Sequence, residues 1–274
     1  MVTFSNCKIN IGLHIVGKRA DGYHNIETLF YPIPIKDAVE IIEEKRSNQL
    51  TTFTTSGNTI DVKNEENICI KAYQLLKKNY PTLPPIKMHL HKVIPMGAGL
   101  GGGSSNATAV LQILNTLFNL QLTTEKLLAY ALMLGSDCPF FVINKPCFAT
   151  RRGQNLTSIP IDLNNYKILL VNPKIHVDTK SAFEGINEKN FSKPNVLLPQ
   201  VLQPIYTWAA NIKNDFEPSV FLKYPQIEVI KNTLYKNGAI YSAMSGSGST
   251  VFGIFDKQKI PYINFPSNYY CQLV

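Results

Sequence analysis

The sequence has few cysteines, few acidic residues and no long apolar run, and each shortage argues against a class of protein. Its five cysteines are scattered without a CxxC pair, which argues against a disulfide framework and against a zinc site. No stretch approaches the length of a membrane span, and Lys8 and Asn10 interrupt the apolar core that a signal peptide would need. We therefore expect a protein of the reducing cytoplasm that has no membrane partner.

Acidic residues are outnumbered by basic ones. The 27 Lys and Arg residues against 19 Asp and Glu residues give a net charge of +8, which suits small anionic substrates or nucleic acid. The basic residues occur only in short pairs, at 18–19, 77–78 and 151–152, and no basic cluster typical of nucleic-acid binding is present. We therefore expect small anionic ligands and no nucleic-acid partner.

The most unusual feature is a glycine-rich stretch over residues 95–107, with five glycines in the seven positions from Gly97 to Gly103. Good N-cap residue types follow at Ser104, Ser105 and Asn106, and apolar residues then recur at helical spacing. Glycines let backbone N–H groups approach a bound anion, and a helix N-terminus favours negative charge. The stretch therefore predicts a phosphate-binding loop.

Two common phosphate loops fit this stretch poorly. A P-loop needs a lysine after its last glycine, but Gly102 is followed by Gly103. The glycine spacing does satisfy the dinucleotide-binding pattern, yet a second helical pattern follows from Thr123, where a Rossmann unit would supply a strand. A dinucleotide enzyme and a glycine-rich turn without a ligand stay open as alternatives.

The N-terminal segment over residues 8–16 alternates apolar and polar residues, which predicts a half-buried strand. Lys8 and Asn10 lie on its polar face, about 7 Å apart. A turn over 17–22 leads to Tyr23 and His24, an aromatic and an imidazole side chain that can stack on a flat ligand ring and hydrogen-bond to it. Simple packing is the alternative interpretation of this pair.

The rest of the chain mixes strand and helix patterns. Strands are expected over 37–44, 49–55, 86–94, 166–172, 239–243 and 251–255, and helices are expected to start at 66–67, 104–106, 123–125 and 177–182 and to span 195–207 and 220–235. Asp137 follows a helix end, precedes Pro139 and is flanked by two phenylalanines, so partial burial of its carboxylate is expected. This position favours a poised general base, with a turn residue as the alternative.

Three stretches of the chain together resemble motifs of the GHMP kinases, small-molecule kinases that wrap the phosphates of ATP in a glycine-rich loop. Residues 95–107 resemble their central signature, 135–139 the motif with the catalytic aspartate, and 244–250 the third motif, which closes against the first loop. Residues 7–24 resemble one branch of the family, which phosphorylates a hydroxyl of a cytidyl diphosphate substrate in the non-mevalonate route to isoprenoid precursors.

The resemblance implies a mixed α/β (α+β), two-lobed GHMP-kinase-like fold with the active site in the cleft between the lobes. It implies an N-terminal ATP-binding lobe over residues 1–144 and a C-terminal lobe over 145–274 that helps to bind the substrate. ATP would be the co-substrate, with Mg²⁺ bridging its phosphates, and the chain would act as a monomer or weak homodimer. A GHMP kinase for homoserine or a mevalonate-type alcohol, and a nucleotide-binding module without catalysis, are the alternatives.

The resemblance also implies roles for individual residues. Asp137 would orient the acceptor hydroxyl and take its proton, and Lys8 would keep Asp137 ionised; no metal ligand is assigned. The substrate would contact Asn10, Tyr23, His24 and Thr179. The ATP site would comprise Pro95, Met96, Gly97, Ala98, Gly99, Leu100, Gly101, Gly102, Gly103, Ser104 and Ser105, with Asn67 and Lys92 beside the adenine. A capping asparagine and a surface lysine are the alternative interpretations of Asn67 and Lys92. Arg151 and Arg152 are interpreted as a solvated hairpin tip, with contacts to the substrate diphosphate as the alternative.

Overall fold

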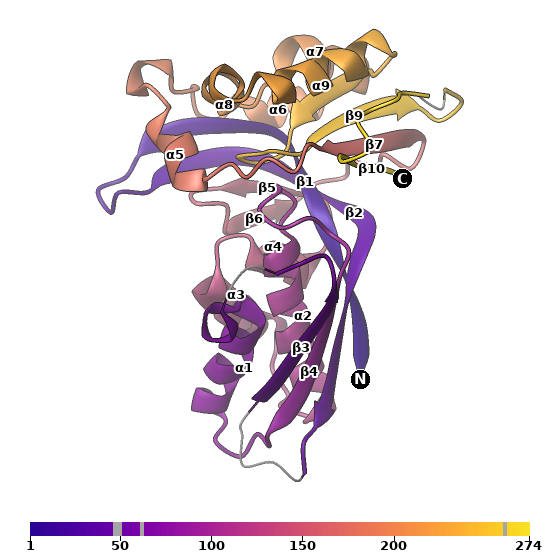
Figure 1. Cartoon of the computed structure of the whole chain (residues 1–274). Helices are drawn as coiled ribbons and strands as arrows, with labels where there is room; N and C mark the ends of the chain where they lie inside the picture. Colours follow the sequence, from indigo (N-terminus) through magenta and orange to yellow (C-terminus); the bar gives the residue numbers. More distant parts are fainter. Residues whose placement is uncertain (46–50, 61–62, 260–261) are drawn as a thin grey trace. The chain divides into compact units, whose positions relative to one another are not determined.

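The computed structural model describes residues 1–45, 51–60, 63–259 and 262–274. It divides into two compact units (Figure 1). The first comprises residues 1–7, 34–96 and 101–144, and the second comprises 8–33, 97–100 and 145–274. The expected boundary after residue 144 is therefore one of several, because residues 8–33 and 97–100 group with the C-terminal part of the chain.

Two long strands contribute to both units. These are β1 (Val2–Lys18) and β2 (His24–Glu43). The expected strands over 8–16 and 37–44 are parts of them, and both strands are longer than the sequence pattern indicates. Every residue of β1 from Cys7 to Ile15 is buried, including the polar ones, so the alternation that predicts a half-exposed strand marks two buried faces here.

The first unit is a sheet covered by helices. Strand β3 (Thr51–Gly57) runs parallel to β4 (Ile86–Lys92), and β4 pairs antiparallel with β2 between Ala38 and Glu43. The helical elements are η1 (Asn64–Glu66), α1 (Ile68–Asn79), α2 (Gly102–Leu117), α3 (Thr124–Leu134) and α4 (Cys138–Ile143). Figure 1 shows α1, α2 and α3 on one side of β3 and β4. The expected strand over 49–55 begins at residues that lie outside the described part of the chain.

The core of the first unit follows from the period of two in its strands. Ile86, Met88 and Leu90 of β4 are buried and pack with Val39 and Ile41 of β2 and with the inner faces of α1 and α2. The intervening side chains of β4 point to the other face of the sheet. Helices α2, α3 and α4 follow one another without an intervening strand, which is incompatible with a Rossmann unit and removes the dinucleotide alternative.

The second unit contains a four-stranded antiparallel sheet in the order β10-β7-β9-β8. Its strands are β7 (Tyr166–Asn172), β8 (Tyr241–Met244), β9 (Val251–Asp256) and β10 (Tyr270–Leu273). The hairpin of β5 (Cys147–Thr150) and β6 (Asn155–Ser158) joins β2, which pairs with β5 between Thr28 and Phe30. Strand β10 has no counterpart among the sequence predictions.

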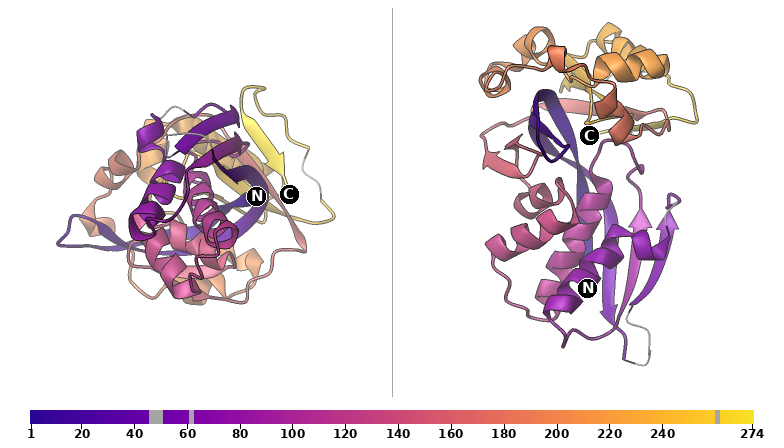
Figure 2. Two further views of the ribbon diagram at one scale, coloured as in Figure 1. Left: turned by 90° about the horizontal axis from the view of Figure 1, so that it is seen from below. Right: turned by 90° about the vertical axis from the view of Figure 1, so that its left-hand side faces the viewer.

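Short helices complete the second unit, and α6 to α9 lie along one face of the β7–β10 sheet (Figures 1 and 2). They are α5 (Thr179–Glu184), η2 (Glu188–Asn190), α6 (Leu197–Val201), η3 (Ile205–Thr207), α7 (Trp208–Asn211), α8 (Glu217–Lys223) and α9 (Pro225–Lys236). Ile227, Ile230 and Leu234 of α9 pack into the core with Phe255 of β9. No helix in the described part of the chain is long and apolar enough to cross a membrane.

Two expected helices are interrupted at prolines. The segment 195–207 is not one helix, because α6 ends before Pro204 and a separate 3-10 turn follows. The segment 220–235 is divided between α8 and α9 at Tyr224, and Pro225 starts the second helix. A proline has no backbone N–H and its ring clashes with the preceding helical turn, which explains both breaks.

Candidate active site

The glycine loop has the backbone geometry that its composition predicts. Gly97, Gly99 and Gly101 take positive φ angles of 59°, 75° and 67°, a region that side-chain-bearing residues rarely adopt. Helix α2 then begins at Gly102, with Gly101 as its N-cap, and the Ser105 N–H donates to the Gly101 carbonyl over 2.9 Å. The first turn of α2 therefore starts inside the glycine run, where its N–H groups have no intrahelical partner.

The assignment of Ser104, Ser105 and Asn106 as N-cap residues is wrong, since all three lie within the first turns of α2. Gly101 replaces them because its left-handed conformation lets the chain enter the helix earlier. The effect is to place small residues along the first turn, with Ser105 buried. The serine hydroxyls are consequently side chains of the helix rather than its cap.

The third expected motif closes on the glycine loop, as predicted. The Thr250 N–H donates to the Ala98 carbonyl over 3.2 Å, and the Ser245 hydroxyl donates to the Gly99 carbonyl over 2.9 Å. A Cβ on Gly99 would lie 1.9 Å from the Ser245 carbonyl oxygen, so only glycine fits there. These contacts all lie within the second unit and hold residues 97–100 in one conformation.

Lys8 and Asn10 lie directly beside this part of the loop. The Lys8 backbone N–H donates to the Leu100 carbonyl over 3.0 Å, and its ammonium donates to the Gly99 carbonyl over 3.0 Å and to Asn10 Oδ1 over 2.5 Å. Asn10 in turn donates to Thr28 Oγ1 over 2.9 Å. Only 3% of Lys8 is exposed, so a positive charge is held among backbone dipoles at the loop, where it favours an anion.

Asp137 occupies the N-cap position of α4, a short helix that sequence reasoning missed although Pro139 in its first turn is a typical start signal. Its side chain is half-buried, in agreement with the expectation of partial burial. The Thr108 hydroxyl of α2 donates to the Cys138 carbonyl over 3.0 Å, which ties this helix start to the helix that follows the glycine loop. Asp137 belongs to the first unit and Lys8 to the second, and their pairing stays a prediction.

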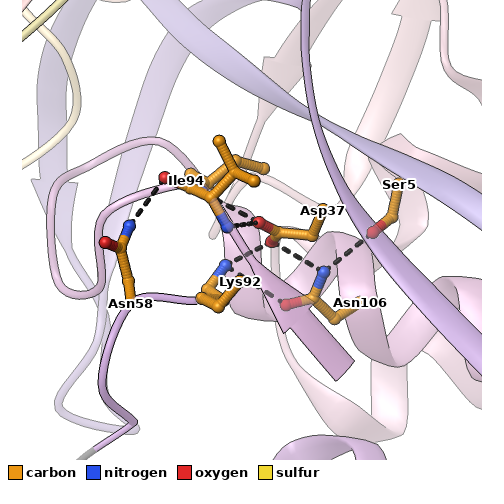
Figure 3. A network of polar contacts seen from close by, with 7 residues as sticks. Ser5, Asp37, Asn58, Lys92, Ile94 and Asn106 are labelled. Carbon is orange, nitrogen blue, oxygen red and sulfur yellow. Dashed lines mark hydrogen bonds and ion pairs between the residues drawn. The ribbon is translucent and has the colours of Figure 1, made fainter. Parts of the chain in front are cut away.

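Lys92 is the centre of a buried polar network in the first unit (Figure 3). Its ammonium forms an ion pair with Asp37, and both side chains are almost completely buried, at 1% and 0% exposure. Lys92 also donates to Asn106 Oδ1 over 3.3 Å. A Cβ on Gly102 would lie 2.9 Å from the Lys92 ammonium, which places this charge directly against the start of α2. The interpretation of Lys92 as a surface lysine is wrong.

Asp37 connects both ends of the glycine loop (Figure 3). Its Oδ1 accepts the backbone N–H groups of Val93 and Ile94 over 2.7 and 2.8 Å, on the chain that enters the loop. Its Oδ2 accepts Asn106 Nδ2 over 2.9 Å, on the helix that leaves it, and Asn106 also donates to Ser5 Oγ over 2.8 Å. Four donors therefore converge on one carboxylate, which satisfies a group that would be costly to bury alone.

Asn67 caps α1, and its Oδ1 accepts the Cys69 N–H over 2.9 Å. The capping interpretation of Asn67 is therefore confirmed, and its contact with adenine stays a prediction. Met96 is exposed at the entrance of the loop, with 44% of its surface accessible. Thr179, at the first position of α5, lies 3.0 Å from the hydroxyl of Ser247 in the third motif, so the expected substrate residue and that motif are neighbours.

Tyr23 and His24 have different partners: His24 contacts two phenylalanine rings, and Tyr23 contacts an arginine. The His24 ring stacks on Phe183 with the centroids 4.7 Å apart, and Phe191 contacts its edge at 6.0 Å. Burial lowers the pKa of His24, and the positive charge of Lys18 lowers it further. Tyr23 instead lies under the Arg152 guanidinium, whose carbon is 3.8 Å from the ring centroid. Their shared role in binding a base stays a prediction.

Sequence reasoning missed several residues of these arrangements. Phe183 follows Thr179 by four positions on α5, so the one-face spacing of a helix could have found it. Asp37 is an acidic residue at the start of an apolar strand pattern and gives no other local signal. Its partners are 55 and 69 residues away in the chain, at Lys92 and Asn106, and no sequence period connects them.

Two models of one protein family match the chain. The model of the GHMP kinases N terminal domain matches residues 67–145, and the model of the GHMP kinases C terminal matches residues 201–261. The first match contains Asn67, the glycine loop and Asp137, and the second contains the third motif.

Similar proteins and structures agree with these matches. A 4-diphosphocytidyl-2-C-methyl-D-erythritol kinase from Bacteroides fragilis is 48% identical over 267 residues, which cover 97% of this chain and 96% of the relative. A crystal structure of a 4-(cytidine 5'-diphospho)-2C-methyl-D-erythritol kinase matches with a TM-score of 0.79 at 27% identity, over 93% of this chain and 90% of that one. A homoserine kinase from Cytophaga hutchinsonii has a TM-score of 0.72 at 16% identity, over 94% and 85% of the two chains, and shares the fold alone.

Proposed function

Because this chain belongs to the 4-diphosphocytidyl-2-C-methyl-D-erythritol kinase family of the GHMP kinases, we propose that it transfers the γ-phosphate of ATP to the 2-hydroxyl of 4-diphosphocytidyl-2-C-methyl-D-erythritol. The observation that carries this proposal is the 48% identity over 97% of the chain. The mevalonate and homoserine alternatives have weaker support, since a homoserine kinase is only 16% identical. The product would be an intermediate of the non-mevalonate route to isoprenoid precursors.

The residues of the glycine loop fit the phosphates of ATP. Three positive-φ glycines and the open first turn of α2 offer backbone N–H groups without side chains in the way. ATP supplies the phosphoryl group, and residues 95–105 would bind and orient it, with Asn67 and Lys92 beside the adenine. Lys92 forms an ion pair with Asp37 beside Gly102, so its ammonium would help to hold the start of α2 in place without adding net charge there.

Lys8 and Asp137 are proposed to perform the proton and charge chemistry. Phosphoryl transfer depends on positioning and charge neutralisation more than on covalent help from the protein. Asp137 would accept the proton of the substrate hydroxyl, which contributes about 10²–10⁴-fold for a well-placed base. Lys8, whose ammonium donates to the Gly99 carbonyl of the loop, would keep Asp137 ionised and offset charge on the phosphoryl group during its transfer.

Mg²⁺ is part of the proposal on chemical grounds. Within residues 1–45, 51–60, 63–259 and 262–274, no group of three or more His, Cys, Asp or Glu side chains could hold a metal ion. Mg²⁺ is usually bound by one or two carboxylates together with nucleotide phosphates and water, so ATP itself would supply most of its ligands. We assign no ligand. Asn10, Tyr23, His24 and Thr179 are proposed to bind the cytidyl substrate.

Two further parts of the proposal concern the whole chain. A reducing compartment is supported by the five cysteines, which form no disulfide bond within the described residues and of which four are buried. A monomer or weak homodimer is proposed, which light scattering after size-exclusion chromatography tests directly.

The decisive experiment is a coupled assay of ADP release with Mg-ATP and three acceptors in parallel. These are 4-diphosphocytidyl-2-C-methyl-D-erythritol, homoserine and mevalonate. We expect ADP release only with the cytidyl substrate. Release with one of the other acceptors would keep the kinase chemistry and reject the substrate, whereas no release with any acceptor, together with normal ATP binding, would favour a nucleotide-binding module.

A further inference from the structure

Tyr23 combines two properties that single out its surroundings in the second unit. Its side chain is half-exposed, with 52% of the residue surface accessible. One ring face is nevertheless covered, because the Arg152 guanidinium lies 3.8 Å from the centroid. Such a ring is a flat platform with one face backed by a cation, an arrangement that suits stacking of a second planar group on the other face.

The backbone around Tyr23 is fixed by its own turn. The Arg19 N–H donates to the Tyr23 carbonyl over 2.8 Å, and the Tyr23 N–H donates to Asp21 Oδ1 over 3.2 Å. Asp21 also forms an ion pair with the Arg19 guanidinium at 2.8 Å. The hydrogen bond from Arg19 lowers the pKa of Asp21, and the positive charge of Arg152 adds to this shift. The turn therefore fixes the backbone of Tyr23, while the Arg152 guanidinium lies over one face of its ring.

Arg152 reaches the ring from the turn between β5 and β6. This turn is anchored to β2 by the Ile26 N–H, which donates to the Arg151 carbonyl over 2.6 Å, and the Arg152 N–H donates to Gln154 Oε1 over 2.8 Å. Arg151 takes a positive φ of 61° and its side chain is exposed, whereas Arg152 is half-buried against Tyr23. The solvated-tip interpretation therefore holds for Arg151, while Arg152 has a specific partner.

We propose that Arg152 is a positioning residue for substrate recognition, which holds the Tyr23 ring so that its opposite face stacks on the cytosine of the substrate. This inference rests on the proposed function, because it takes Tyr23 as a contact of the cytidyl group. A planar guanidinium restricts the rotation of an exposed tyrosine by covering a whole ring face, which an ammonium group does less well. Restricting the ring before binding reduces the entropy lost when the base stacks on it.

The first test compares steady-state kinetics of Arg152→Ala, Arg152→Lys and the matched control Arg151→Ala. We expect Arg152→Ala to raise the KM for the cytidyl substrate by about three- to tenfold, a range typical of a cation–π contact, while kcat and the KM for ATP stay within about twofold. Arg152→Lys should recover only a small part of this loss, because its ammonium keeps the charge but does not cover the ring face as a planar guanidinium does. Arg151→Ala should match the wild type.

Several outcomes of the kinetics would overturn the proposal. A lysine variant with wild-type KM would assign the effect to charge instead of stacking. An equal rise in KM for Arg151→Ala would indicate a general loss of positive charge near the substrate. A fall in kcat without a change in KM would indicate a structural role. A lower midpoint of thermal unfolding together with a proportional fall in kcat would indicate the same.

A binding measurement separates this inference from the proposed function. Calorimetric titration of the wild-type chain and Arg152→Ala with cytidine 5'-diphosphate needs no turnover. We expect the variant to bind about three- to tenfold more weakly. Equal affinities would reject the role of Arg152 alone, whereas a wild-type chain that does not bind cytidine 5'-diphosphate would contradict the proposed substrate as well.

Discussion

At the scale of single residues, the proposed reaction depends on one carboxylate. Asp137→Asn removes the proton acceptor and keeps the size of the side chain, so we expect kcat to fall by about 10²–10⁴-fold while ATP binds with unchanged affinity. Single-turnover measurement of ADP formation, with ATP affinity measured separately by calorimetry, checks both statements. A variant with near-normal kcat would remove Asp137 from the mechanism.

His14 gives a prediction of pH dependence at the same scale. Its side chain is buried and neither ring nitrogen has a hydrogen-bond partner, and burial lowers its pKa below the ordinary value of 6.5. Asp215 opposes this shift and Lys213 adds to it. Below pH 6.5 the unfolded chain binds the proton more readily than the folded one, so stability falls as the pH decreases, by at most about 1.4 kcal/mol per pH unit. Above that pH His14 has no such effect.

The variant His14→Leu cannot titrate at this position, and we therefore expect a shallower loss of stability between pH 7 and pH 5 than in the wild type. Urea unfolding at pH 8, 7, 6 and 5 gives the free energy of unfolding for both proteins. The difference at pH 8 reports the packing change alone, and the additional difference at low pH reports the proton. Parallel pH curves for the two proteins would show that His14 does not contribute.

At the scale of elements, the buried pair of Asp37 and Lys92 joins β2, β4 and the start of α2. Asp37→Asn leaves the Lys92 ammonium buried without its carboxylate, a change that typically costs about 3–5 kcal/mol. Ser5→Ala is the matched control, because it removes only the acceptor of one Asn106 hydrogen bond and leaves one buried N–H unpaired, which typically costs about 1–3 kcal/mol. Chemical denaturation of both variants gives the free energy of unfolding and checks that Asp37→Asn lowers it more than Ser5→Ala does.

A double-mutant cycle isolates the pair itself. Asp37→Asn combined with Lys92→Met should cost clearly less than the sum of the single changes, because the second substitution removes the uncompensated charge that the first one leaves. Additive costs would mean that the two side chains stabilise the first unit independently, in which case Asp37 would act mainly through the Val93 and Ile94 N–H groups.

The elements also show what sequence reasoning can reach. Strand β7 is predicted at its observed bounds of 166–172, and the glycine loop and its contact with the third motif are predicted from composition and family resemblance. The strand and the loop are predicted from residues that lie close together in the sequence, and the contact is predicted from the family resemblance. The start of α2 is predicted at 104–106 instead of Gly102, because glycine and serine are both common N-cap residues. Helix α4 is not predicted, because its six residues are too few to show a helical period. The Asp37 network is invisible to any local pattern, since three strands and a helix of distant sequence assemble it.

At the scale of the whole molecule, the chain passes between its units several times, and this has a consequence for dissection at residue 144. Residues 8–33 and 97–100 belong to the second unit. In that unit, Thr28 to Phe30 of β2 pair with β5, Leu13 forms an isolated bridge with Asn214, and Gly99 contacts Ser245. A cut after Asn144, the boundary that the family resemblance implies, therefore separates strand pairs and core residues of one unit.

We accordingly expect the fragments 1–144 and 145–274 to fail to fold separately. Leu29 and Phe30, which are fully buried in the chain, would be exposed in the first fragment, and β5 would lose its partner strand in the second. An exposed strand edge with apolar residues favours aggregation, so the first fragment should be insoluble or lack a cooperative thermal transition. Circular dichroism with thermal melting of each fragment and of the intact chain checks this. A soluble 1–144 fragment with a cooperative transition would mean that the first unit folds by itself. Burial of Val39, Ile41 and Met88 against α1 and α2 would then be enough to stabilise β1 and β2 without their partners in the second unit.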